Sequence, residues 1–172
     1  MSDSFNPGRP RPVVTPLDLL RVRIDHEAFD AAIFALEAVA ADLGYGDVRP
    51  LPGAIAWIDQ LREDDKRIAV SAGGERVERA LEIAGVSDRF DVVVVGRTAT
   101  ERLATAFDEL GVAADRAVVV GCDPVELEAA RAANVELAIG VARGAATPEQ
   151  LRRAGAATVV ADLQELLAPG VG

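Results

Sequence analysis

Five polar side chains of this sequence lie at or shortly after the ends of short apolar segments, a position at which reactive groups are often found. They are Glu37, Ser71, Arg97, Asp123 and Glu126. Carboxylates can act as general acids or bases or bind a metal ion, and a serine hydroxyl with a guanidinium can bind an anion. The sequence therefore offers the parts of a small-molecule site, provided that the fold brings these residues together.

The apolar segments predict buried strands. They are short, rich in Val and Ile and without strict alternation, and they lie at Ala31 to Leu36, Arg67 to Val70, Val92 to Val95, Ala117 to Val120, Leu137 to Val141 and Thr158 to Val160. Such segments are typical of strands covered on both faces of a parallel sheet. Amphipathic segments between them predict helices at Leu51 to Arg62, Glu75 to Ala84, Thr100 to Leu110 and Pro124 to Ala133.

Strands and helices that alternate with short connections predict a three-layer, doubly wound α/β sheet. In such a sheet the ligand lies beyond the carboxyl ends of the strands. Glu37, Ser71, Arg97, Asp123 and Glu126 all follow strand ends, so we expect them to converge on one rim.

The length of 172 residues predicts one globular domain, which we place at residues 15–172. Residues 1–14 are rich in Pro and Arg and predict a flexible tail. After them, Thr15 followed by Pro16 predicts the beginning of a short helix.

Composition excludes several classes of function. A net charge of −10 argues against nucleic acid or an anionic membrane surface as the main partner. No apolar segment approaches the roughly 18 residues of a membrane span, and the beginning of the chain lacks the apolar segment of a secretory signal. The single cysteine, Cys122, excludes an internal disulfide framework and a multi-thiolate metal site. We therefore expect a cytoplasmic protein.

Four motifs follow one another in the sequence, and the first is FDAAIFALEAVAAD at residues 29–42. It resembles FDAVIFDLDGVxxD, the first motif of the haloacid dehalogenase (HAD) superfamily, in particular of its β-phosphoglucomutase-like phosphatases and mutases. A strand-ending Ser or Thr corresponds to Ser71 in IAVSAGG, and a Lys that begins the third motif corresponds to Arg97 in RTATERLATAFDELGV. The fourth motif, VxDSxxGxxAAxxAG, resembles VGCDPVELEAARAAN. The resemblance implies a HAD-like core over most of the chain.

The chain differs from the family at the positions that provide the family's catalytic and metal-binding residues. By resemblance, the nucleophilic Asp corresponds to Ala35, the acid/base Asp to Glu37, and an Asp that binds Mg²⁺ to Cys122. An alanine methyl has no lone pair with which to attack phosphorus, and a thiol is a poor ligand for Mg²⁺. We therefore expect no cofactor, with Mg²⁺ needed only if the chain is a hydrolase after all.

The resemblance also implies a helical cap domain between the first two motifs, and this sequence has no room for one. Loss of the cap is expected to expose apolar surface, and Leu36, Val39 and Leu43 are the candidates for it. We expect a protein partner, or self-association, at this face.

Each polar candidate also has a structural interpretation. Ser71 and Asp123 could cap the helices that follow them, and Arg97 could lie in solvent or pair with Glu101. At the same rim, Glu37 could simply be solvated. Cys122 is interpreted as a small buried hydrophobe, with a reactive thiol as the alternative.

Two hypotheses for function follow. The first is a pseudo-phosphatase, a HAD-like domain that acts as a binding, regulatory or assembly module. The alternative is a weak phosphate-ester hydrolase, with Glu37, Asp123 and Glu126 holding a metal ion, or a protein that binds a phosphosugar through Ser71 and Arg97.

Overall fold

The computed structural model describes residues 24–44, 46–74 and 76–167, and the predicted tail and the helix expected after Thr15 lie outside them. The strands are β1 (Ala31–Ala35), β2 (Ala40–Gly44), β3 (Asp47–Pro50), β4 (Arg67–Ala72), β5 (Val92–Val95), β6 (Ala117–Gly121), β7 (Leu137–Val141) and β8 (Thr158–Val160). The helices are α2 (Leu36–Val39), α3 (Pro52–Glu63), α4 (Val77–Ala84), α5 (Ala99–Leu110), α6 (Pro124–Ala132) and α7 (Pro148–Ala154). Short 3₁₀ turns lie at His26–Ala28 (η1), Ser87–Arg89 (η2), Ala114–Arg116 (η3) and Leu163–Leu166 (η4).

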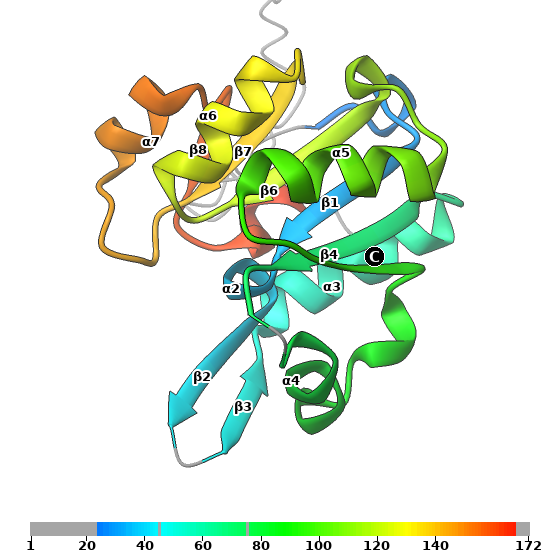
Figure 1. The fold of residues 1–172 in the computed structure, drawn as a ribbon, viewed down its shortest axis with the longest axis vertical. Coiled ribbons are helices and arrows are strands. Elements are labelled where there is room, and N and C mark those ends of the chain that lie inside the picture. Colours follow the sequence, from blue (N-terminus) through cyan, green and yellow to red (C-terminus); the bar gives the residue numbers. More distant parts are fainter. Residues whose placement is uncertain (1–23, 45, 75, 168–172) are drawn as a thin grey trace, which may run out of the picture.

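Six strands form one parallel sheet in the order β5-β4-β1-β6-β7-β8. Helices α5, α6 and α7 cover one face, and α3 and α4 lie on the other (Figure 1). Because both faces are covered, side chains alternate between two cores. Along β1, Ala31 and Ile33 pack under α5 and α6, whereas Ala32 and Phe34 pack against α3. The predicted three-layer, doubly wound α/β sheet is confirmed.

The predicted strands and helices agree with the structure to within about two residues at most boundaries. Gly85 and Gly111 end α4 and α5 with φ of 73° and 63°, a left-handed conformation that glycine adopts without strain. The prediction missed α7, which begins at a capping box between Thr147 and Gln150. No described helix is long and apolar enough to cross a membrane.

The chain between β1 and β4 forms the short helix α2, an antiparallel β2–β3 hairpin and then α3. The hairpin projects beyond the sheet (Figure 1). The described residues 36–44 and 46–66 therefore contain no helical cap domain. The hairpin itself was missed, because the residues between the first motif and the helix predicted from Leu51 were interpreted as a short connection.

The expectation of an exposed apolar face is corrected at one residue. Val39 is fully buried, because it lies on the side of α2 that packs into the core, together with Ala38. Leu36 is partly buried against the same core, and the side chain of Leu43 lies outside the described part of the structure.

The first turn of α3 packs so closely on η4 that only glycine fits at position 53. A Cβ on Gly53 would overlap Asp162 Oδ1 and lie 2.8 Å from the Gln164 amide nitrogen, which donates to the same Asp162 oxygen. We expect Gly53→Ala to lower the free energy of unfolding by about 1–3 kcal/mol, because it overpacks this contact. Urea unfolding measures the change.

The matched control is Gly74→Ala. A Cβ at Gly74 would have no described atom within 4 Å, so this variant should unfold like the parent chain. Equal stability of the two variants would contradict the close contact at Gly53.

Candidate functional site

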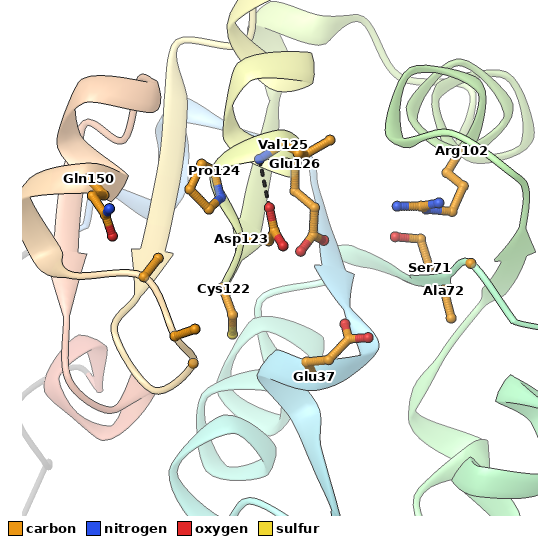
Figure 2. A pocket seen from close by; sticks show the side chains of 14 residues that line it. Glu37, Ser71, Ala72, Arg102, Cys122, Asp123, Pro124, Val125, Glu126 and Gln150 are labelled. Atoms are coloured by element: carbon orange, nitrogen blue, oxygen red, sulfur yellow. Dashed lines mark hydrogen bonds between the residues drawn. The ribbon is translucent and has the colours of Figure 1, made fainter.

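A pocket of about 690 Å³ opens at the carboxyl ends of the central strands, where the sequence predicts a site (Figure 2). Its walls come from α2, the end of β4, α5, the β6–α6 connection and the loop after β7. The lining residues are Glu37, Ser71, Ala72, Gly73, Arg102, Cys122, Asp123, Pro124, Val125, Glu126, Gly144, Ala145, Ala146 and Gln150. Of the predicted site residues, Glu37, Ser71, Cys122, Asp123 and Glu126 meet here.

The central strand β1 ends beneath this pocket at Ala35. This residue is 2% exposed and lies beside Ser71 in the parallel register of β1 and β4. A second, small cavity of about 10 Å³ adjoins the Ala35 methyl group and is also lined by Ser71, Arg102 and Glu126. The tip of the strand therefore presents carbon where the related motif has a carboxylate.

The β6–α6 connection supplies Cys122 and Asp123. Asp123 caps α6, since its Oδ1 accepts a hydrogen bond of 2.8 Å from the Val125 amide, as predicted. Cys122 is buried, and burial together with the nearby charge of Glu126 raises the pKa of its thiol to about 12. At neutral pH it is a thiol and not a thiolate, which agrees with the buried hydrophobe and not with a reactive cysteine.

Glu126 is the most perturbed acid of the pocket. It leans over Gly121, where a Cβ would lie 3.1 Å from that of Glu126, so glycine makes room for it. Burial, followed by the charges of Glu37 and Asp123, raises the pKa of Glu126 to about 7, against the opposing effects of Arg102 and of a hydrogen bond with the Cys122 backbone. The carboxyl thus titrates near neutral pH.

The opposite wall carries Ser71 and Arg102. Ser71 is 7% exposed, and its hydroxyl makes no hydrogen bond within the described residues. It does not cap α4, whose N-terminus has no side-chain cap. Arg102 passes over Gly96, donates to the Gly96 carbonyl at 3.0 Å and ends near Gly73.

The cation of this pocket is Arg102 and not Arg97. Arg97 is exposed, is not a lining residue and forms no ion pair with Glu101 or with any other described residue. A signal for Arg102 was present in the sequence, because it lies three residues after Ala99 and directly before Leu103 on the buried side of α5. Gln150 and Gly144 were missed because the residues after the predicted strand at Leu137 to Val141, which is β7, were not considered as part of the site.

Glu37 lies at the mouth of the pocket. Its side chain is exposed, as the structural interpretation expected, and its carboxylate faces the pocket (Figure 2). Its carbonyl oxygen accepts a hydrogen bond of 2.9 Å from Arg143.

The donor set does not fit the Mg²⁺ ion that the resemblance implies. Ala35 offers no oxygen, and the protonated thiol of Cys122 is a poor ligand for a hard cation. Across residues 24–44, 46–74 and 76–167, no three His, Cys, Asp or Glu side chains are placed to hold a metal ion. This includes Glu37, Asp123 and Glu126, the metal-binding set of the hydrolase alternative.

Replacing Glu126 should change how stability depends on pH. Its pKa is about 7 in the folded protein against an ordinary value of 4.5, so between these values the folded state keeps a proton that the unfolded state has lost. The free energy of unfolding therefore falls as pH rises through this interval. Glu126→Gln cannot ionise and should lack this part of the decline, on the order of 1–3 kcal/mol between about pH 4.5 and pH 8.

Urea unfolding at the two pH values measures this difference. Glu128→Gln, which changes an exposed acid of the same helix, should keep the parent dependence. A Glu126→Gln variant with the parent dependence would show that Glu126 titrates normally.

Comparison with known proteins places these features in context. A family model described as haloacid dehalogenase-like hydrolase matches residues 21–139. A trehalose-phosphate phosphatase from Mycobacterium leprae is 31% identical over 151 residues, which cover 85% of this chain and 34% of that protein. The chain thus spans about a third of the length of this curated relative.

Solved structures match the fold. A haloacid dehalogenase-like family hydrolase from Streptococcus pneumoniae has a TM-score of 0.69 at 8% identity and covers 81% of this chain and 97% of its own. A β-phosphoglucomutase from Clostridium difficile has a TM-score of 0.68 at 15% identity, with 81% and 93% covered. At these identities the similarity concerns the fold alone.

Proposed function

The chain belongs to the haloacid dehalogenase-like hydrolase family, and we propose that it is a member without phosphoryl-transfer chemistry, a binding, regulatory or assembly module. The family resemblance of the four sequence motifs is confirmed.

The observation that carries this proposal is the alanine at the tip of β1. Covalent catalysis needs an oxygen, nitrogen or sulfur atom that can attack phosphorus, and Ala35 has only a methyl group. The nearest hydroxyl, Ser71, lies beside a guanidinium, but no described histidine or lysine lines the pocket to activate it. The pocket therefore has a binding surface without the inherited nucleophile.

The chemistry at the end of β6 supports the same proposal. In the related motif this position provides an Asp for Mg²⁺, and here Cys122 is a buried thiol with a pKa of about 12. Without a metal ion, the charge that develops on a transferring phosphoryl group would face Glu37, Asp123 and Glu126. Such a field would raise the barrier instead of lowering it.

A second candidate function is binding, or weak hydrolysis, of a phosphorylated sugar. Ser71 and Arg102 form a small anion-binding wall, and the name of the Mycobacterium leprae relative refers to a sugar phosphate. Because this chain aligns with only a third of that relative, the activity of the whole relative is offered here as a candidate only. The three acids of the pocket weigh against a dianionic ligand.

Turnover distinguishes these functions. The full chain, incubated with Mg²⁺ and either a chromogenic phosphate ester or a panel of sugar phosphates, should release phosphate no faster than its Ser71→Ala variant. Phosphate release is measured by colorimetry, and covalent phosphoenzyme by intact mass.

The back-substitution Ala35→Asp with Cys122→Asp is the matched probe of the lost chemistry. It restores both carboxylates and should bind Mg²⁺ at least about tenfold more tightly than the parent chain, as measured by calorimetry. Phosphate release by the parent chain well above the Ser71→Ala level would contradict the proposal.

A protein partner, or a second copy of this chain, at the face beside α2 and the hairpin is also proposed. Leu36 is only partly buried there, and no described cap covers it. We expect light scattering to give a mass above the 18.0 kDa of one chain, with Leu36→Glu reducing it. A mass of one chain at all concentrations, with no partner bound, would remove this proposal.

A further inference from the structure

The four charged side chains that line the pocket form no direct ion pair in the described part of the chain, although the charge of Arg102 acts to lower the pKa of Glu126. Elsewhere the described residues form ion pairs, such as Arg116 with Asp30 at 2.9 Å. No such pair involves Glu37, Arg102, Asp123 or Glu126. The electrostatic free energy of unpaired charges in a half-enclosed pocket becomes more favourable when a ligand supplies the opposite charge.

The two signs of charge lie on different walls. Arg102 comes from α5 and points to the end of β4, where Ser71 lies, whereas Glu37, Asp123 and Glu126 belong to α2 and to the beginning of α6 (Figure 2). The pocket therefore has a cationic side with Arg102 and an acidic side with Glu37 and Asp123. Glu126 lies between them, because it also lines the small cavity beside Ser71 and Arg102.

A second observation, independent of the charges, indicates that a ligand binds on the cationic side. The Ser71 hydroxyl belongs to a side chain that is more than nine-tenths buried, faces the pocket beside Arg102 and has no hydrogen-bond partner in the described residues. Ser71 Oγ is not fully enclosed, because Trp57 Nε1 is the only wholly buried side-chain N or O atom without a partner in the described residues. The hydroxyl therefore opens onto the pocket, where it can bind a ligand. Arg102 donates one N–H to the Gly96 carbonyl, and its remaining N–H groups can donate to a ligand.

The acidic side disfavours further negative charge. Burial and the neighbouring carboxylates Glu37 and Asp123 raise the pKa of Glu126, so that negative charge accumulates there only at a free-energy cost. A cation placed between these acids would lower that cost. A ligand that carried only an anionic group would leave the cost in place, and one that carried only an ammonium group would leave Arg102 unpaired.

We propose that the pocket binds a zwitterionic small molecule, with its anionic group on Arg102 and Ser71 and its ammonium group between Glu37, Asp123 and Glu126. The inference rests on the proposed function in that it assigns a ligand class to the same non-catalytic pocket. The anionic group is a carboxylate or a phosphate, since both suit a guanidinium and a hydroxyl.

Isothermal calorimetry on the full chain at about pH 8, where Glu126 is largely ionised, tests the ligand class. The probes are 4-aminobutyrate, 6-aminohexanoate and phosphoethanolamine. Each is compared with its two halves, namely butylamine with butyrate, hexylamine with hexanoate, and ethanolamine with inorganic phosphate. At least one zwitterion should bind roughly tenfold or more tightly than either half, and the carboxylate and phosphate probes identify which anion is preferred.

Two variants then separate the two walls. Arg102→Gln should weaken the best probe about tenfold while leaving binding of its amine half unchanged or stronger, and Glu37→Gln should weaken the amine half as well as the whole probe. The controls are Arg97→Gln and Glu128→Gln, both exposed and outside the pocket, which should bind like the parent. Circular dichroism verifies that each variant is folded.

The inference is overturned if no zwitterion exceeds its halves, or if folded Arg102→Gln and Glu37→Gln both bind the best probe like the parent. Neither result would contradict the proposed function, because the proposed function is tested separately by phosphate release. Conversely, release of phosphate from phosphoethanolamine would overturn the proposed function while supporting the ligand class.

Discussion

The parallel pairing of β1 with β4 on one side and β6 on the other is the constraint on which the rest of this structure depends. All five residues of β1 are buried, and its register places Ala35 beside Ser71, with the β6–α6 connection on the other side. Three strand ends therefore meet at one rim, and whatever stands there shares one pocket. The residue at the tip of β1 is Ala35, and its methyl group is what led us to propose a pocket that binds a ligand without attacking it.

Three acids and one arginine line the pocket at this rim. In a metal-dependent site, acids near the strand ends are compensated by the ion. Here Glu37, Asp123 and Glu126 form no ion pair within the described residues, and burial of Glu126 raises its pKa to about 7. The same imbalance that opposes a phosphate dianion makes the acidic wall a place for an ammonium group.

Sequence reasoning placed most of the site because strand ends are easy to recognise. Val- and Ile-rich segments, helix-ending glycines and the Asp123–Pro124 helix beginning are local signals, and the structure agrees with each of them. The sequence did not predict which residues line the pocket where the direction of a side chain matters more than its position in the chain. Arg97 lies two residues after a strand and is exposed to solvent, whereas Arg102 reaches the pocket from within α5 because Gly96 leaves room for its side chain.

The sequence by itself determined the fold class, the rim and the absence of an oxygen nucleophile on residue 35, since these depend on residue type, periodicity and order along the chain. Only the tertiary structure decided which arginine enters the pocket, that Val39 is buried, that the Ser71 hydroxyl has no hydrogen-bond partner among the described residues, and that Arg102 and three acids share one pocket. Those features arise from contacts between segments far apart in the chain, where packing and local dielectric, and not local propensity, set the position and the charge of each group.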